Sequence, residues 1–377
     1  MEEKAGGSLP FVGRAFLSIR GVRVVSMEQR QEQDLDHFHS HVADRLLDLL
    51  PAADSSHNLL TLPFLHKLLD AFLSCDHEFR SLLRDRDLAG LLSRPPADRA
   101  VADLLGRAVK WLDICNAASL ALDSVRHSLR LADTAASAIL SCDGPLGRSR
   151  RALTKLLASF PDSSSRRSER SGSSGRSSGI GNLRSHGSRT YSSGGSIPPV
   201  PANLGVARGG ETGGAGIALA GYAMSSILTF TMWVLAAAFI CQDLAAVVPS
   251  SPVSPQQHLP WAGTMVLLQD RMAAEWRRRK GEAVQLAEME ALERWGKVLM
   301  VAVVREGGRA QAEDAAAELA EACRRLEEGL GPLERQVREV FHRVVCSRAE
   351  VLRFAEQSTQ AAAAAAAPNP PQTGVRP

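Results

Sequence analysis

The run His-Phe-His-Ser-His at residues 37–41 has the greatest potential for chemistry in this chain. On a helix, Asp34, His37 and His41 would share one face, and imidazole and carboxylate groups at that spacing can bind Zn²⁺ or another divalent ion. However, Phe38 marks an apolar side of the same helix. The solvated polar edge of an amphipathic helix explains the histidines without a metal ion, so we predict no metal site.

The rest of the sequence contains no familiar catalytic pattern. The other seven histidines have no nucleophile or carboxylate at motif spacing. The glycines gather in linker-like segments instead of forming a phosphate-binding loop, and neither a G-x-S-x-G nor an H-E-x-x-H motif is present. We therefore predict that the protein is not an enzyme and has no catalytic, cofactor-binding or metal-binding residues.

Positive charge is concentrated in the middle of the chain. Residues 1–144 contain 16 basic and 20 acidic side chains, residues 145–214 contain 11 and 3, and residues 215–377 contain 17 and 18. This distribution argues against a globally basic nucleic-acid binder. The short run Arg-Arg-Arg-Lys at residues 277–280 is followed by acidic residues and is typical of a solvated helix face. No nucleic-acid partner is predicted.

The composition indicates a helical protein. Of 377 residues, 45% are hydrophobic, which allows a sizeable core, and only 5% are aromatic, while Ala, Leu and Arg are abundant. The six cysteines form no C-x-x-C pair, as expected in a reducing compartment. We predict an all-α fold in which an N-terminal antiparallel helical bundle and a C-terminal helical region are joined by a disordered Ser/Arg/Gly-rich linker.

Apolar periodicity and helix breakers place the individual helices. An apolar stripe follows Ser26, which stands at capping-box spacing from Gln29, and Pro51 ends that helix. The pair Pro95-Pro96 forces a further break. Other helical stretches are expected at residues 63–86, 98–142, 261–304 and 310–357, with a corner at residues 329–332 in the last.

These features divide the chain into six segments. The linker cannot bury enough apolar surface to offset its chain entropy. Within it, Ser173 and Ser192 each follow an arginine by three residues, which is the spacing of basophilic-kinase phosphorylation sites. The predicted segments are a basic, irregular N-terminal arm (1–25), the N-terminal helical bundle (26–158), the disordered linker (159–214), an apolar helix (215–248), the C-terminal helical region (249–358) and a low-complexity tail (359–377).

Residues 216–241 contain no charged side chain and are long enough to cross a bilayer as a helix. Serine, threonine, alanine and glycine keep the hydropathy modest, so a buried central helix is the alternative. The first interpretation predicts a single-pass membrane protein. The basic linker could also attach the protein peripherally to anionic lipid, and otherwise a cytoplasmic protein is expected. The candidate membrane segment contains Gly216, Ile227, Leu228, Phe230, Trp233, Leu235, Phe239 and Cys241.

Five blocks of sequence carry a family resemblance. The first block is residues 11–50, which contain Arg-Gly-Val-Arg-Val-Val-Ser-Met, and the second is Trp-Leu-Asp-Ile-Cys-Asn-Ala from Trp111. The third is Met-Trp-Val-Leu-Ala-Ala-Ala-Phe-Ile-Cys-Gln-Asp from Met232, and the fourth is residues 259–271, which begin Leu-Pro-Trp-Ala. The fifth is Gly-Pro-Leu-Glu-Arg-Gln-Val-Arg-Glu-Val-Phe-His-Arg from Gly331. In this order they cover most of the chain outside the linker and tail. Together they resemble the plant BYPASS-related family, which includes the ROH-type proteins.

The resemblance implies a plant protein without known enzymatic activity, and the family has no catalytic residues to carry over. Some members of the family bind the membrane-targeting subunit of the exocyst tethering complex, while others affect shoot and root development through a mobile signal. We therefore expect a membrane-associated helical adaptor or regulator that acts with the exocyst in secretion and development. The alternative is a soluble regulator of a small-molecule, root-derived signalling pathway.

Overall fold

The computed structural model describes residues 12–50, 59–84, 91–92, 94–141, 146–160, 199–200, 214–240, 252–279, 286–304 and 309–366, with the backbone alone at residues 12–28, 240, 361–362 and 364–366. The described chain is all-α, as its composition predicts. Its elements are α1 (Val12–Leu47), α2 (Leu62–Arg84), α4 (Ala97–Leu140), α5 (Leu146–Ser159), α7 (Ala215–Leu235), the π-helical turn η2 (Ala236–Ile240), α9 (Ala262–Arg278), α10 (Ala287–Val304) and α11 (Arg309–Ala366).

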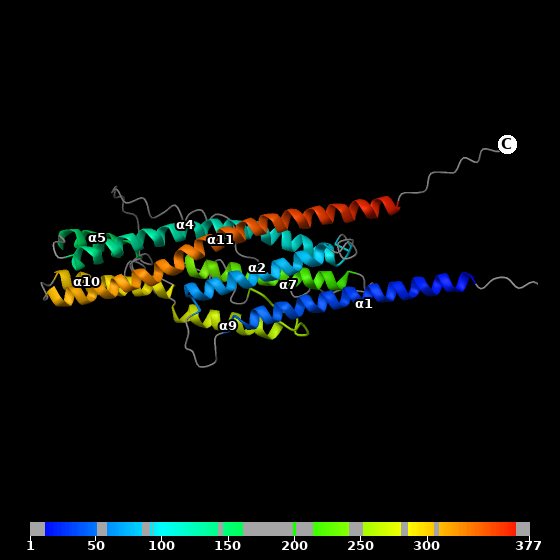
Figure 1. Cartoon of the computed structure of the whole chain (residues 1–377), viewed down its shortest axis with the longest axis horizontal. Coiled ribbons are helices and arrows are strands. Elements are labelled where there is room, and N and C mark those ends of the chain that lie inside the picture. Colours follow the sequence, from blue (N-terminus) through cyan, green and yellow to red (C-terminus); the bar gives the residue numbers. More distant parts are fainter. Residues whose placement is uncertain are drawn as a thin grey trace, which may run out of the picture.

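The helices form one elongated bundle with α7 in its interior (Figure 1). Helix α7 packs against α1, α2 and α4, and α11 runs along both α2 and α4. At one end of the bundle, α5 and α10 pack together beside α4 and α11. The N-terminal part of α1 and the C-terminal part of α11 project from the opposite end (Figure 1). The two ends of the bundle therefore present different elements to a partner.

Helices from both sides of the linker share one hydrophobic core. In α2, apolar residues recur at helical spacing, so Leu65, Leu68, Phe72 and Phe79 line one buried side. Phe72 stacks on Trp111 of α4, with ring centroids 5.5 Å apart. The same core includes residues of α7, α10 and α11. The N-terminal and C-terminal helical regions, which the linker separates in the sequence, thus pack into a single body.

Helix α11 continues through residues 329–332, where the sequence predicts an internal corner, so the helix is not interrupted there. Pro332 removes one helical hydrogen bond, but the buried side chains of Leu330 and Leu333 hold the helix on the core on both sides of it. Gly329 serves a close approach instead, because a Cβ atom there would lie 2.7 Å from Cδ1 of Leu62 on α2. Packing between helices overrides the local breakers here.

Both ends of the chain are more helical than the sequence suggests. Helix α1 begins at Val12, so residues 12–25 of the arm that was expected to be irregular are helical. Helix α11 continues to Ala366, into the segment expected to be a low-complexity tail. Alanine has the highest intrinsic helix propensity, which explains this extension. Residues 161–198 and 201–213 of the predicted linker lie outside the described residues.

Candidate functional site around helix α7

Helix α7 is enclosed by the rest of the chain. It is the one helix among the described residues that is long and apolar enough to cross a membrane, and 94% of its apolar window is buried inside the protein. Of the candidate membrane segment, Ile227, Leu228, Phe230, Trp233 and Leu235 are buried. Gly216 and Phe239 are partly buried, and Cys241 lies outside the described residues. A helix that is hydrophobic all round is expected either in a membrane or in the core of a protein.

Three of the buried hydroxyl groups of α7 are satisfied within the helix, whereas the Oγ atom of Ser225 has no hydrogen-bond partner among the described residues. The hydroxyl groups of Ser226, Thr229 and Thr231 each donate to the carbonyl oxygen four residues earlier, at 2.7–2.8 Å. Small residues let the neighbouring helices approach, since a Cβ atom on Gly221 would lie 3.2 Å from the Cβ atom of Ala100 on α4. The modest hydropathy of this segment therefore reflects close helix packing.

A buried arginine fastens α7 to α4. Arg107 is 2% exposed, and its Nε and Nη2 atoms donate to the Asp103 carboxylate at 2.6 and 2.9 Å. Its Nη1 atom donates to the Thr229 hydroxyl at 3.0 Å, and Nη2 also donates to the Pro199 carbonyl at 3.0 Å. One cation thus joins α4, α7 and the residue before Val200, and leaving its acceptors without it would be costly.

A short extended segment, residues 252–254, lies against the other side of α7. The Tyr222 hydroxyl donates to the Ser254 carbonyl at 2.6 Å, and burial raises the pKa of Tyr222 to about 12. The Gln269 side chain brackets Val253, accepting from its N–H at 2.9 Å and donating to its carbonyl at 3.1 Å. Val200 donates to the Pro252 carbonyl at 3.0 Å and forms an isolated parallel bridge with Val253.

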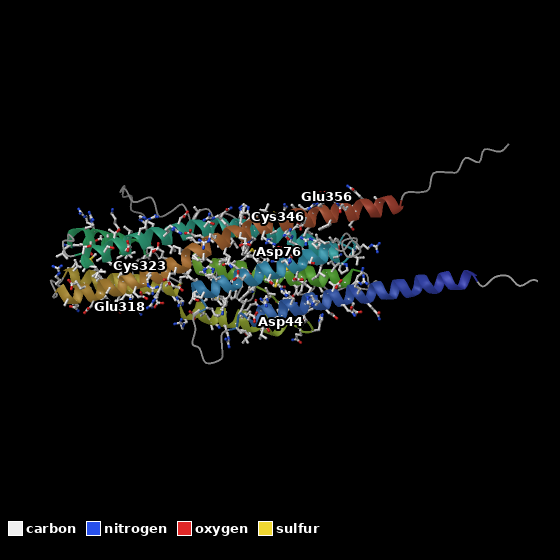
Figure 2. All side chains as sticks on the ribbon, in the orientation of Figure 1. Asp44, Asp76, Glu318, Cys323, Cys346 and Glu356 are labelled. Carbon is white, nitrogen blue, oxygen red and sulfur yellow. The ribbon has the colours of Figure 1, made fainter. Side chains whose placement is uncertain are left out.

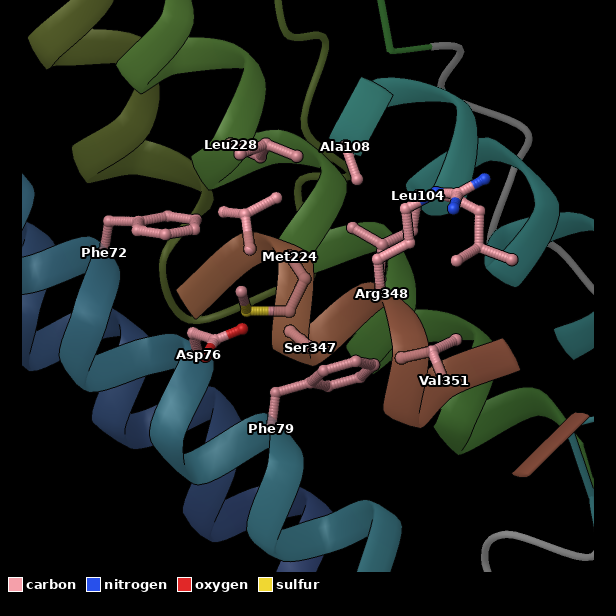
Figure 3. Close-up of a pocket in the computed structure, with 12 residues that line it drawn as sticks. Phe72, Asp76, Phe79, Leu104, Ala108, Met224, Leu228, Ser347, Arg348 and Val351 are labelled. Atoms are coloured by element: carbon pink, nitrogen blue, oxygen red, sulfur yellow. The ribbon is translucent and has the colours of Figure 1, made fainter. Parts of the chain in front are cut away.

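A small cavity lies where α2, α4, α7 and α11 meet (Figure 3). The volume within it that is accessible to water is about 30 Å³, and all the empty space in and in front of it is about 360 Å³. This is room for only a few water molecules at most. Its walls are mainly apolar and include Phe72, Phe79, Leu104, Leu228, Val344 and Val351.

Asp76 supplies the main polar group of this cavity. The residue is 3% exposed, and its Oδ2 atom has no hydrogen-bond partner among the described residues. Burial raises the pKa of Asp76 to about 6, although a hydrogen bond with Ser347 acts in the opposite direction. Figure 2 places Asp76 in the middle of the bundle. Arg348 also lines the cavity, and its Nε atom has no partner in the described part of the chain.

Ion pairs connect the two halves of the chain, and one of them, between Arg80 and Glu350, lies near the cavity. Arg80 of α2 holds Glu350 of α11 through two hydrogen bonds, of 2.7 and 2.5 Å, and this pairing lowers the pKa of Glu350. Arg126 of α4 holds Glu334 of α11 in the same way, at 2.9 and 2.6 Å. The bidentate geometry fixes the positions of the helices more than it adds stability, because these groups are partly solvated.

The histidines of residues 37–41 lie in different environments and do not converge on one site. Asp34 and His37 are exposed, whereas His41 shares a hydrogen bond of 2.9 Å with the hydroxyl of Ser74. His39 is buried and accepts a hydrogen bond of 3.2 Å from the indole N–H of Trp261. Burial lowers the pKa of His39 to about 4. No group of three possible metal ligands is found in the described ranges.

The predictions from sequence do not include Asp76 or Arg107, the two buried charged residues of the site around α7. Asp76 and Arg107 both interrupt apolar stripes, Asp76 between Phe72 and Phe79 and Arg107 between Leu104 and Trp111. A charge on an apolar stripe is the signal that could have identified them. The candidate phosphorylation sites Ser173 and Ser192 lie outside the described residues and remain predictions.

Comparison with known proteins identifies the family. The family model described as "Protein ROH1-like" matches residues 8–354. The chain belongs to the ROH1-like family. It is 37% identical to Protein ROH1A of Arabidopsis thaliana, with 94% of this chain and 97% of that protein covered, and 32% identical to Protein ROH1D of the same plant, with 90% and 95% covered. The search of solved structures found no significant match.

Proposed function

We propose that this ROH1-like protein is a non-enzymatic helical adaptor that associates with membranes peripherally. The burial of α7 carries this proposal, because the most apolar helix of the chain already has a complete protein environment. Insertion of α7 into a bilayer would leave Arg107 without its hydrogen bond to Thr229 and would expose the apolar faces of α1, α2 and α4. Outer helix faces are then the surfaces available to membranes and partners.

Alkaline carbonate extraction of native plant membranes tests the peripheral mode of attachment. We expect the protein to be released into the supernatant, because high pH strips proteins held by surface charge but not helices inserted in hydrocarbon. A known single-pass protein in the same membranes is the control and must stay in the pellet. Retention of the protein in the carbonate pellet would show that α7 or another segment is inserted and would refute the proposal.

The proposed partner is the membrane-targeting subunit of the exocyst, as the family resemblance implies. Adaptors of this kind use preformed helical surfaces, and the rigid bundle with its two projecting helices, α1 and α11, offers such surfaces (Figure 1). Purified full-length protein should bind the purified subunit directly in a pull-down. Failure of the two purified proteins to bind would contradict this partner while leaving peripheral membrane association to be decided by the carbonate test.

A second candidate function is the binding of a small molecule at the Asp76 cavity. The cavity combines apolar walls with an unpartnered carboxylate oxygen, and its small volume limits a ligand in this arrangement to a few heavy atoms. Native mass spectrometry of protein purified from plant tissue should then reveal a bound compound. The variant Leu228→Phe, which narrows the cavity, should lose that mass, and circular dichroism checks that the variant is folded. A native spectrum that contains the bare protein alone would speak against this function.

A further inference from the structure

Helix α5 carries the least balanced charge in the folded part of the chain. Arg148, Arg150, Arg151 and Lys155 are all exposed, and residues 144–161 contain no acidic side chain. None of the four cations forms an ion pair within the described residues. The arginines of α11, in contrast, are interleaved with glutamates, as in the pairs of Arg324 and Arg325 with Glu321.

The body of the protein holds this helix rigidly. The apolar side of α5 is buried through Ala152, Leu153 and Leu156. The Ser149 hydroxyl donates to the Ala135 carbonyl of α4 at 2.9 Å, so the N-terminal turn is fixed to its neighbour. On α10, Gly296 allows close contact, because a Cβ atom there would lie 3.2 Å from Leu156. With the inner side fixed, the four cations spread across the solvent side of α5.

Two exposed leucines lie at the ends of α4 and α5 that face this tip of the bundle. Leu146 begins α5 and is 61% exposed, and Leu140 ends α4 and is 48% exposed. Figure 1 shows this end of the bundle far from the projecting ends of α1 and α11. Exposed leucines beside cations suit a surface that offers both negative charge and hydrocarbon.

We propose that the exposed face of α5, formed by Arg148, Arg150, Arg151 and Lys155 with Leu146 at its edge, is the surface that binds anionic phospholipid. This inference rests on the proposed peripheral membrane association and deepens it by naming the surface. Charge complementarity favours the assignment, since four unbalanced cations match the diffuse negative potential of an anionic leaflet. The described residues of α5 include no aromatic side chain on which an unpaired base could stack.

Vesicle flotation of the purified full-length protein tests the inference. Wild-type protein should float with vesicles of phosphatidylcholine and phosphatidylserine but not with phosphatidylcholine alone. Replacing the four α5 cations by glutamine should lower the partition coefficient by roughly 100-fold or more, given the usual attraction of each cation to such a surface. Glutamine preserves helix propensity, and circular dichroism checks that the variant is folded.

A matched control removes the same charge elsewhere. The variant Arg99→Gln, Arg335→Gln, Arg338→Gln and Arg353→Gln neutralises four exposed arginines of α4 and α11. Because charges beyond a Debye length are screened, its partition coefficient should stay within about threefold of wild type at physiological salt. An equal loss in the control variant would overturn the assignment to α5, and so would full vesicle binding by the α5 variant.

The variant Leu146→Gln separates lipid from other anionic partners. If the leucine enters hydrocarbon, its loss should weaken vesicle binding by roughly tenfold. If wild-type protein binds a duplex DNA oligonucleotide instead of vesicles, and the α5 charge variant loses this DNA binding, the face binds nucleic acid and the lipid proposal is overturned. If carbonate releases the protein from membranes but the purified protein does not float with anionic vesicles, the α5 inference alone is overturned. Carbonate-resistant protein would instead refute the proposed peripheral function.

Discussion

Helices α5 and α7 are opposite solutions to helix packing within one bundle. Helix α7 carries no charge and is buried on all sides, whereas α5 buries one apolar stripe and exposes four cations. On hydropathy alone, α7 is the natural candidate for membrane contact and α5 is an ordinary surface helix. Their environments reverse this order, because the core already surrounds α7 while the basic face of α5 contacts solvent. Hydropathy predicts that a helix will be buried, but it does not distinguish burial in a bilayer from burial in a protein core.

Truncating an aromatic side chain of α7 should cause the largest loss of stability, because α7 is the buried helix of the pair. Phe230 is fully buried, so Phe230→Ala removes apolar contacts and leaves a cavity, at a cost of about 3–5 kcal/mol in the free energy of unfolding. Urea unfolding followed by circular dichroism measures it. Leu120→Ala on α4, where the leucine is 60% exposed, is the control and should change stability by less than about 0.5 kcal/mol. If Phe230→Ala does not lower the free energy of unfolding, α7 is not a core helix in solution.

The variant Arg107→Met tests the fastening of α7 to α4. Removing the guanidinium leaves Asp103 and Thr229 without their partner in a buried site, so we expect a loss of about 3 kcal/mol. The matched control is Arg126→Met, because Arg126 also makes a bidentate ion pair but is 39% exposed. That loss should be about 1 kcal/mol or less. Equal losses in both variants would contradict the special role of Arg107.

The sequence predicts the class and most helices of this fold because apolar periodicity and proline breaks are local signals. Helix α2, expected at residues 63–86, spans Leu62–Arg84, and α4, expected at residues 98–142, spans Ala97–Leu140. The sequence does not predict that the helix continues through Pro332, because the deciding contacts, such as Gly329 against Leu62, join residues far apart in the chain. The Asp76 cavity depends on four helices meeting, which no local pattern specifies.

The pH dependence of stability should isolate Asp76, which lies beside α7. Its pKa rises to about 6 in the folded protein, so the folded state binds more protons than the unfolded state between pH 4 and pH 6. Stability from this group is therefore full below about pH 4 and is lost as the pH rises through 6, by up to about 3 kcal/mol. The variant Asp76→Asn should lack this loss and be more stable than wild type at pH 7. Parallel pH profiles of the two proteins, measured by urea unfolding, would contradict the assignment.

A smaller effect is expected where α7 holds the extended segment. Tyr222→Phe removes the hydroxyl that donates to the Ser254 carbonyl and should cost about 1 kcal/mol. Hydrogen exchange should also become faster at the backbone amide of Val253, while the α2 amides keep their protection. Unchanged exchange at Val253 would show that residues 252–254 are held by Gln269 and Val200 without the Tyr222 hydroxyl.

The smallest effect on stability is expected from the α5 charge variant, and this sharpens the contrast with α7. Its four cations are exposed and form no ion pair in the described structure, so their joint replacement by glutamine should change the free energy of unfolding by about 0.5 kcal/mol or less. Removal of like-charge repulsion along the helix even favours a slight gain. A stable variant that no longer binds anionic vesicles would separate function from folding, because residues kept for structure alone lose stability when they are replaced. A large loss of stability would instead mean that these side chains support the bundle.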